Sequence, residues 1–467
     1  MTAVFWSWWS MRRRSMCSVV ASLREGSNLQ SPGTGSNVAA RAFPRVVGPL
    51  HGEVRVPGSK SVSNRALVCA ALANGPCAVS GLAEGDDTAR MVAGLATLGA
   101  EIDVAGTTAR VGSAIERSGS RAITLDAGLA GTTSRFLTAV AALCEYETTV
   151  TGAEALLRRP MGELHRLLRE MGVVVTSQND GRLPVTVSRG TSNPTGERVL
   201  EARGDVSSQF VSAVMMIAPL SGGIRLRLSG PVVSAGYLDM TADVMHAFGA
   251  SVRVRRESSG TTVWVDAGDY HATTFVVDAD WSSSSYPFAA IGLVGGEVLV
   301  PHLRTSSSQP EVAFAGVLER MGCTVHADES GVRVSRDPDH RLCGVDVDMA
   351  EISDLVPTLA VLGACAEGTT RIRGVGFIRA KESDRLGDLA SELRKCGVDV
   401  SVADDGLDVR GGSLQAASIE PHHDHRLAMS LALLGMCRDG IEVRDPDVVS
   451  KSWPSFWTSM QSGLGIG

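Results

Sequence analysis

Two short motifs place cationic side chains beside turns from which helices are expected to begin. VPGSKSVSNR carries Lys60, Ser61 and Arg65 directly after a Pro-Gly turn, and LAGTTSRF carries Arg135 one helical turn beyond Gly131. The free N–H groups of a helix N-terminus attract anions, whereas cations usually stabilise the opposite end. Cations at these positions therefore favour an anionic ligand, although solvated charges on a surface turn would give the same pattern.

Hydroxyl and amide side chains that suit a phosphate or a polyol lie in the middle of the chain. They belong to the segments DVSSQF and VVSAGYLD and are Ser207, Ser208, Gln209, Ser234 and Tyr237. A serine or an aspartate in such a place is also a common helix N-cap. The two interpretations do not exclude each other.

A dense group of titratable side chains lies in the last third of the chain. The segments EISDLVPT, RAKESDR, HHDHR and VVSKSWP hold Asp354, Lys381, Glu382, Arg385, His425, Arg426 and Lys451. Glu382 and Arg385, three residues apart, would form an ion pair on one face of a helix. Arg159, which precedes a proline at an expected helix start, is a further cation that faces either an anion or solvent. The HHDH run resembles a metal cluster, but the other side chains that a metal would need are cations here, so no metal is predicted.

An internal repeat organises these motifs. An amphipathic helix that ends in glycine and runs into a strand-like segment occurs five times, as in LHRLLREMGVVVTS. The terminal glycines, spaced 73, 77, 73 and 75 residues apart, are Gly99, Gly172, Gly249, Gly322 and Gly397. Each glycine is expected to cap its helix in the left-handed conformation. So regular a period indicates one α/β unit copied several times, with a sixth, degenerate copy near residues 427–443.

Composition limits the class of protein. A chain of 467 residues, of which 44% are apolar, suits about two domains with sizeable cores. The net charge of -7 argues against nucleic acid as a partner, and no apolar run is long enough for a membrane span. Nine cysteines without a CxxC pair are expected to be buried thiols in a reducing, cytoplasmic compartment. Residues 1–40, which are aromatic and then rich in Arg, Ser and Gly, are expected to form a disordered leader rather than an import signal.

The motifs in their order are similar to those of the 5-enolpyruvylshikimate-3-phosphate synthase family. PGSKSVSNR, AGTTSR, SSQF, KESDR and DHR carry the resemblance, which extends over residues 56–451. It implies an α/β fold of two pseudo-threefold domains, each built from three βαβαββ units as an inside-out α/β barrel. It also implies a discontinuous first domain of residues 41–58 and 278–467 and a second domain of residues 59–277. The substrates would bind in a cleft between the domains that closes on them.

The resemblance further implies a reaction and a set of binding residues. The enolpyruvyl group of phosphoenolpyruvate would pass to the 5-hydroxyl of shikimate-3-phosphate, with release of phosphate and without a cofactor. The residues expected at shikimate-3-phosphate are Lys60, Ser61, Arg65, Ser207, Ser208, Gln209, Ser234, Asp354 and Lys381. Those expected at phosphoenolpyruvate are Lys60, Gly131, Arg159, Gln209, Arg385, Arg426 and Lys451, with Arg135, Tyr237 and His425 in support.

Asp354 and Glu382 look like the carboxylates that transfer protons in this family. Asp354, with Lys381 beside it, is expected to take the proton of the substrate hydroxyl. Glu382, or Lys60 in its place, is expected to protonate the methylene carbon of phosphoenolpyruvate. Since such a cleft is built within one chain, a monomer is expected.

The chain departs from the family pattern at two places. Leu129 stands where many members have Asn, and Ala235-Gly236 stands where many have a basic residue and a proline. We expect glyphosate, a phosphoenolpyruvate-like inhibitor, to bind beside Gly131. Two alternatives stay open: enolpyruvyl transfer to UDP-N-acetylglucosamine on the same fold, and a binding protein that has lost activity.

Overall fold

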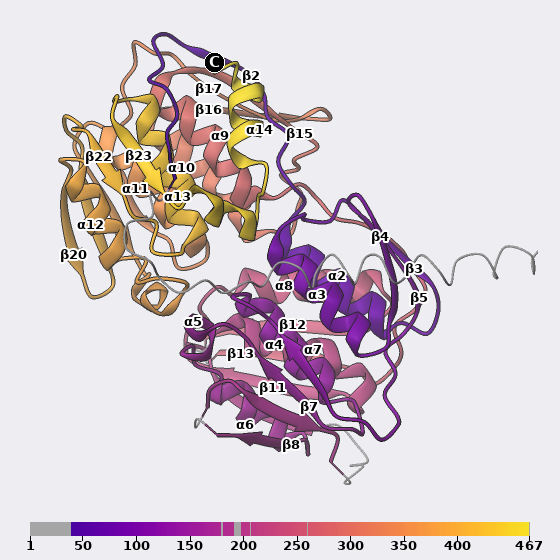
Figure 1. Ribbon diagram of the computed structural model, residues 1–467. Coiled ribbons are helices and arrows are strands. Elements are labelled where there is room, and N and C mark those ends of the chain that lie inside the picture. Colours follow the sequence, from indigo (N-terminus) through magenta and orange to yellow (C-terminus); the bar gives the residue numbers. More distant parts are fainter. Residues whose placement is uncertain (1–38, 179–180, 191–197, 206, 259, 467) are drawn as a thin grey trace, which may run out of the picture. The chain divides into compact units, whose positions relative to one another are not determined.

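The computed structural model describes residues 39–178, 181–190, 198–205, 207–258 and 260–466 (Figure 1). The predicted leader therefore lies outside the described residues except for its last two positions. Residues 40–467 form one compact unit. None of the helices in the described part of the chain has the length and apolar character that a membrane span requires.

One βαβαββ unit is continuous in the last third of the chain. In chain order it consists of β18 (Asp346–Asp348), α11 (Val356–Cys365), β19 (Thr369–Arg373), α12 (Gly387–Lys395), β20 (Asp399–Ala403) and β21 (Gly406–Arg410). β18 runs parallel to β19, and β19 pairs antiparallel with β21, whose other edge takes β20. The two helices make the parallel crossovers, and a hairpin closes the unit.

Two more units repeat this order in the middle of the chain. The first comprises β6 (Ile123–Asp126), α4 (Gly131–Ala141), β7 (Thr148–Thr151), α6 (Gly162–Glu170), β8 (Val174–Ser177) and β9 (Val185–Ser188). The second comprises β10 (Arg198–Arg203), α7 (Ser208–Ile217), β11 (Ile224–Ser229), α8 (Gly236–Ala247), β12 (Val252–Glu257) and β13 (Gly260–Val265). The predicted repeat is thus confirmed as a structural unit.

Two units are assembled from segments far apart in the chain. One joins β14 (Thr274–Val276) in parallel to β3 (Cys77–Ser80), with α2 (Lys60–Leu72), α3 (Asp86–Thr97), β4 (Glu101–Ala105) and β5 (Thr108–Ser113). The other joins β2 (Leu50–Glu53) in parallel to β15 (Gly296–Pro301), with α9 (Trp281–Val294), α10 (Phe314–Arg320), β16 (Thr324–Asp328) and β17 (Gly331–Arg336). The chain passes from one of these units to the other twice, after β2 and after β14. The two passing segments run antiparallel and pair at Gly58 and Ala279.

The sixth unit corrects one expectation. It contains β22 (Ala417–Ile419), α13 (His425–Ala432), β23 (Ile441–Arg444) and α14 (Phe456–Leu464), with β1 (Ala40–Arg41) antiparallel to β23. The segment near residues 427–443 is only its first half. The helix that ends in a left-handed glycine is α14, followed by Gly465 with φ of 65°. A cap of this kind was missed because the strand-like segment that marks the other five copies does not follow it. The five predicted cap glycines all have positive φ, as expected.

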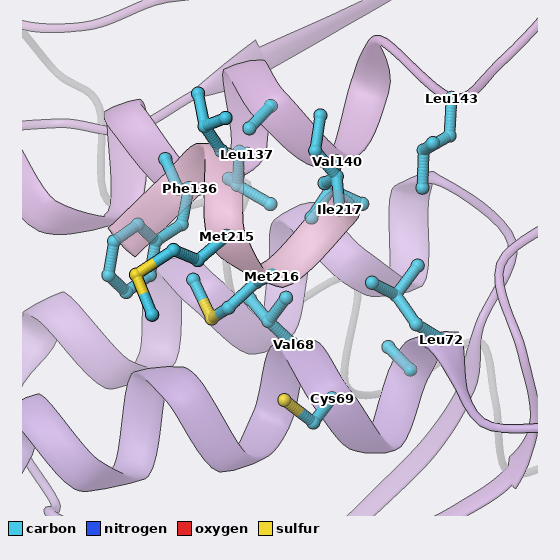
Figure 2. Close-up of a cluster of buried hydrophobic side chains, with 14 of the residues drawn as sticks. Val68, Cys69, Leu72, Phe136, Leu137, Val140, Leu143, Met215, Met216 and Ile217 are labelled. Atoms are coloured by element: carbon cyan, nitrogen blue, oxygen red, sulfur yellow. The ribbon is translucent and has the colours of Figure 1, made fainter. Parts of the chain in front are cut away.

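Buried apolar side chains form two separate cores. One extends from Val62 to Val277, and the other takes Phe43, Leu50 and Val54 together with side chains from Trp281 to Ile466. Figure 2 shows how side chains of α2, α4 and α7 pack together in the first core. These helices carry apolar residues on nearly every face, and such helices are stable only when they are surrounded by other elements.

Short helical turns complete the described structure. They are α5 (Glu154–Leu157), η2 (Pro219–Ser221), η3 (Pro310–Ala313), η4 (Ser353–Leu355), η5 (Gly376–Ala380), η6 (Leu433–Met436) and η7 (Pro446–Lys451). η4 and η5 hold or directly precede several predicted site residues.

Candidate active site

The N-terminal ends of buried helices carry the predicted site residues. α2 begins at Lys60, α4 at Gly131, α7 at Ser208 and α13 at His425, while Asp354 lies two residues before α11. Each end offers free N–H groups and a partial positive charge. Because these ends meet at one cavity, anions are stabilised there before any side chain contributes.

The cavity has a volume of about 300 Å³. The predicted residues that line it are Lys60, Ser61, Arg65, Gly131, Arg135, Arg159, Ser207, Ser208, Gln209, Ser234, Tyr237, Asp354, Lys381, Glu382, Arg385, His425 and Arg426. Lys451 is the one predicted residue that does not line it. Its ammonium nitrogen instead contacts the carboxylate of Glu382 at 3.0 Å, so its effect on the cavity passes through that residue.

Three of the serines that line the cavity are Ser207, Ser208 and Ser234. Ser207 occupies the N-cap position of α7, as the N-cap interpretation predicted, but its side chain makes no capping hydrogen bond. Ser208 is buried at the first position of α7. Ser234 has a left-handed backbone with φ of 53°, and its hydroxyl donates to the carbonyl of Ala350 at 3.3 Å. Ser207 and Ser208 can donate their hydroxyls to a phosphate, and Ser234 can do so once its hydroxyl turns away from Ala350.

Two buried guanidinium groups face the cavity with few internal partners. Arg135 donates to the side chain of Gln209, and its Cζ lies 5.0 Å from the ring centre of Phe210. Burial, followed by the like charge of Arg159, lowers the pKa of Arg135 to about 9. Within the described residues, the Nε atoms of both arginines have no hydrogen-bond partner. The pair therefore has unused donors for an anionic ligand.

Asp354 is surrounded by cations. Arg426 lies 2.8 Å from its carboxylate, Arg385 2.9 Å and Lys381 3.6 Å. Burial alone would raise the pKa of Asp354, but these cations, Arg426 first, outweigh it and hold that pKa well below the usual range. In this arrangement Asp354 is ionised and weakly basic.

Glu382 is held in the same manner. Its carboxylate contacts Lys451 at 3.0 Å, Arg385 at 2.8 Å and Arg159 at 3.5 Å. Burial opposes ionisation, yet the cations, Lys451 first, hold the pKa of Glu382 well below its usual range. Arg385 bridges both catalytic candidates, because it also contacts Asp354.

Arg65 is more strongly engaged by the protein than the sequence suggested. Its side chain is buried and donates to Thr241 at 2.8 Å, to the carbonyl of Ser61 at 2.9 Å and to Ser212 at 3.1 Å. Burial lowers the pKa of this guanidinium to about 10. Arg65 thus helps to fix the wall of the cavity.

The three histidines of the HHDH segment have different surroundings in the structure. His422 contacts Glu392 at 2.8 Å, His423 contacts Asp445 at 3.8 Å, and His425 is buried at the cavity. In the described residues, no group of three or more His, Cys, Asp or Glu side chains is arranged to hold a metal ion. Burial, followed by the neighbouring cations, holds the pKa of His425 well below its usual range, so the ring is neutral.

Several residues that shape the cavity were missed from the sequence. The carboxylate of Asp87 contacts Lys60 at 2.9 Å, and Asp424 contacts Nε of Arg385 at 2.6 Å. Asp424 stands inside the DHR motif, so a signal was present. Nothing around Asp87 marks it, because its partner is 27 residues away and meets it only through the packing of α2 and α3. Phe377 adds an aromatic wall.

Tyr237 contacts the carboxyl group of Glu311, a residue that was not predicted from the sequence. Its hydroxyl donates to Glu311, which is buried, and burial raises the pKa of Glu311 to about 7. The neighbouring Gly236 donates its N–H to Glu351 at 2.9 Å. A β-carbon at Gly236 would lie 2.8 Å from Cβ of Pro310, which gives this departure from the family pattern a local packing reason.

Two cores of three α/β units each, with a cavity ringed by cations, helix N-termini and two half-buried carboxylates, define the enolpyruvyl transferase class. Such a cavity is suited to two anionic substrates and to proton transfer between them. The model of the family EPSP synthase (3-phosphoshikimate 1-carboxyvinyltransferase) matches residues 44–460. The chain belongs to the EPSP synthase family, as its motifs predicted.

Individual relatives agree with this assignment. The 3-phosphoshikimate 1-carboxyvinyltransferase of Methanothermobacter thermautotrophicus is 37% identical over 409 residues, which cover 88% of this chain and 95% of the relative. The enzyme of the same name from Syntrophobacter fumaroxidans is 37% identical over 425 residues, covering 89% and 99%. The solved EPSP synthase of Acinetobacter baumannii has a TM-score of 0.74 at 25% identity and covers 91% of this chain and 98% of that one. The predicted α/β fold is thereby confirmed.

Proposed function

We propose that the cavity binds shikimate-3-phosphate and phosphoenolpyruvate together and performs the reaction of the family. The 5-hydroxyl oxygen of shikimate-3-phosphate forms a bond to C2 of phosphoenolpyruvate while the C2–C3 double bond opens and C3 takes up a proton. The resulting tetrahedral intermediate expels inorganic phosphate from C2, and C3 loses a proton, which restores the double bond. The chain thereby serves aromatic amino acid biosynthesis. One observation carries the proposal: cations and helix N-termini from five helices or their leading turns meet at a cavity that also holds two ionised carboxylates.

The cations of the cavity are paired with its own carboxylates, which take the places that substrate anions would occupy. Arg385 and Arg426 contact Asp354, while Arg159 and Arg385 contact Glu382. The carboxylate and phosphate of phosphoenolpyruvate compete for the same guanidinium groups, which bind planar oxyanions well. Binding of phosphoenolpyruvate therefore removes guanidinium partners that keep both carboxylates weakly basic, while Lys381 stays beside Asp354 and Lys451 beside Glu382.

This exchange gives each carboxylate its role. Once Arg385 and Arg426 turn to phosphoenolpyruvate, the pKa of Asp354 rises, and the residue can accept the proton of the 5-hydroxyl. Loss of Arg159 and Arg385 raises the pKa of Glu382 in the same way. Glu382 can then carry the proton that the methylene carbon receives, with Lys60 as the rival donor. Because the arginines leave the two carboxylates only when phosphoenolpyruvate binds, the carboxylates become able to transfer protons only in the occupied cavity.

The hydroxyl-lined side of the cavity suits the phosphate of shikimate-3-phosphate. Ser207, Ser208 and Ser234 supply hydroxyl groups there, and the N-terminus of α7 adds N–H donors. Gln209, bonded to Arg135, lies where the two substrates would meet. Binding the two phosphates on separate walls keeps the reacting hydroxyl beside C2 of phosphoenolpyruvate.

We also propose the domain limits that the family resemblance implies, with residues 59–277 as the second domain and the rest of the described chain as the first. The two cores fall on either side of these limits, and the crossing segments pair at Gly58 and Ala279. Since one chain lines the cavity, a monomer suffices for activity. The eight cysteines of the described residues are free thiols, which suits the cytoplasm. The molar mass of the protein, measured by light scattering after size-exclusion chromatography, would test whether it is a monomer.

Phosphate release tests the reaction directly. Purified protein is mixed with phosphoenolpyruvate and shikimate-3-phosphate, without added metal and with a chelator present, and inorganic phosphate is followed over time. A parallel sample contains UDP-N-acetylglucosamine as the acceptor. Release with the shikimate ester alone supports the proposal. Release with the sugar nucleotide alone would move the chain to the other acceptor, and release with neither, from folded protein, would indicate a binding protein.

A further inference from the structure

The residues that lead into α8 are bonded to a loop that packs with the opposite core. α8 contributes side chains to the same core as α2, α4 and α7, whereas the loop after β18 contributes side chains to the other core. The hydroxyl of Ser234 donates to the carbonyl of Ala350 at 3.3 Å. The N–H of Gly236 donates to the carboxylate of Glu351 at 2.9 Å. Two hydrogen bonds therefore join the start of α8 to this loop.

The backbone of Ser234 depends on such contacts. Its φ of 53° lies in the left-handed region, and a residue with a β-carbon keeps this conformation only where its surroundings hold it. On one side of Ser234, the N–H of Val233 donates to the carbonyl of Gly204 at 3.1 Å. On the other side stands the bond from Gly236 to Glu351. Glu351 therefore helps to hold the serine that is proposed to bind the phosphate of shikimate-3-phosphate.

The loop that carries Glu351 also carries Asp354, three residues further on. Its backbone forms two successive turns: the N–H of Ile352 donates to the carbonyl of Met349 at 3.0 Å, and the N–H of Leu355 donates to the carbonyl of Ile352 at 3.0 Å. Because the loop is short and bonded to itself, the separation between Glu351 and Asp354 is fixed. The contact with α8 thus connects the proposed phosphate-binding serine to the proposed base.

We propose that Glu351 is a positioning residue: its bond to the start of α8 fixes the hydroxyl of Ser234 relative to Asp354. The inference rests on the proposed function, because it concerns how shikimate-3-phosphate is placed. The phosphate of that substrate binds at one end of the connection, and its 5-hydroxyl reacts at the other. A substrate that is held at a set distance from the base reacts faster than one that shifts by about an ångström. The carboxylate of Glu351 is also favoured beside the partial positive charge of a helix N-terminus.

Gly236 is the residue that makes this bond possible. Many family members have a proline at this position, and proline has no N–H to donate, so those members cannot form the bond. A β-carbon at Gly236 would lie 2.8 Å from Cβ of Pro310, so the close approach of the two segments also requires glycine. The neighbour of Pro310, Glu311, accepts the hydroxyl of Tyr237 and holds the same segment from η3. The connection through Glu351 therefore distinguishes this chain from members that have the proline.

Steady-state kinetics of two Glu351 variants test the inference. Glu351→Ala removes the acceptor, and we expect kcat/KM for shikimate-3-phosphate to fall about two- to tenfold, through a higher KM and a lower kcat. The KM for phosphoenolpyruvate should change less than about twofold, because its proposed cations are untouched. Glu351→Gln keeps an acceptor oxygen and should restore most of the loss. Glu329→Ala is the matched control: it removes an exposed glutamate from the turn between β16 and β17 and should leave all three values unchanged.

A double-mutant cycle and hydrogen exchange identify the route. If Glu351 acts through Ser234, Glu351→Ala should change the KM for shikimate-3-phosphate less than about twofold when Ser234→Ala is already present. Amide exchange at the start of α8, followed by mass spectrometry without substrate, should be faster in Glu351→Ala than in the wild-type protein. Since Glu351 is exposed, exchange in the rest of the described chain should stay the same.

The outcomes separate this inference from the proposed function. Unchanged exchange or unchanged kinetics in Glu351→Ala, or an equal effect of that substitution with and without Ser234, would overturn the inference while the wild-type protein still turns over shikimate-3-phosphate. Wild-type protein that neither binds nor turns over shikimate-3-phosphate would overturn the proposed function, and this inference with it.

Discussion

Replacement of Gly131 by alanine should weaken phosphoenolpyruvate binding through one displaced side chain. A β-carbon at this position would lie 2.5 Å from Nη1, 2.9 Å from Cζ and 3.2 Å from Nη2 of Arg159. Ordinary contact begins near 3.4 Å, so the guanidinium must shift by about 1 Å. A shift of that size breaks a charge-assisted hydrogen bond to the substrate, which contributes about 1.5–3 kcal/mol. We therefore expect the KM for phosphoenolpyruvate to rise about 10- to 160-fold.

Steady-state phosphate release, with each substrate varied in turn, measures this effect. The KM for shikimate-3-phosphate should change less than about twofold, because, in the described part of the chain, the serine hydroxyls proposed to bind that substrate do not contact Arg159 through any assigned interaction and Arg159 is assigned to phosphoenolpyruvate. Glyphosate should inhibit the variant more weakly, since it would use the same cations. Gly316→Ala is a matched control: it also lies in a helix, α10, and its β-carbon would meet no atom within 4 Å. An unchanged KM for phosphoenolpyruvate, or an equal rise for both substrates, would refute the reasoning.

Three further substitutions test the carboxyl groups and their partners. Asp354→Asn should lower kcat by about 10²- to 10⁴-fold while phosphoenolpyruvate still binds. Single-turnover kinetics measure the first effect and calorimetry the second. An active variant would disprove the role of Asp354 as the base. Lys451→Met should raise the pKa of Glu382, because that carboxylate loses its strongest cationic partner. As the proton donor, Glu382 must be protonated, so the basic limb of the kcat–pH profile should move upward; an unmoved limb would exclude Glu382 as its origin. Burial raises the pKa of Glu311 from 4.5 to about 7, so the native state binds more protons than the unfolded state in that window and loses stability as pH rises through it. Glu311→Gln should remove this loss of unfolding free energy, which is worth about 3 kcal/mol at full burial. Denaturant unfolding of both proteins at pH 4.5 and at pH 8 measures it. An equal change in unfolding free energy between these pH values in both proteins would contradict the prediction.

The repeat was visible in the sequence because its two signals are local. A helix that ends in a left-handed glycine and a following strand with alternating apolar residues need only a few neighbouring positions. The sixth copy was placed too early because α14 has no strand after it within the described residues, and β1 takes part in that sheet instead. When segments at opposite ends of a chain pair, the pairing produces no periodic pattern in the amino-acid sequence.

The site was predictable in part for a similar reason. Lys60, Asp354 and Glu382 stand in motifs whose residue types suit the chemistry, and the structure places all three at one cavity. Their partners were harder to foresee: Asp87 and Glu311 meet the site only through packing. Lys451, by contrast, was named from its motif, yet its contact with Glu382 belongs to the tertiary structure.

The sequence by itself determined which side chains are available, the repeat that carries them and the family to which the chain belongs. Only the tertiary structure decided how the charges are balanced. Asp354 and Glu382 lie among arginines and lysines from distant segments, and burial makes each contact strong enough to set the protonation state. Pairing of this kind depends on distances of a few ångströms between elements far apart in the chain. The sequence specifies those distances only through the complete fold.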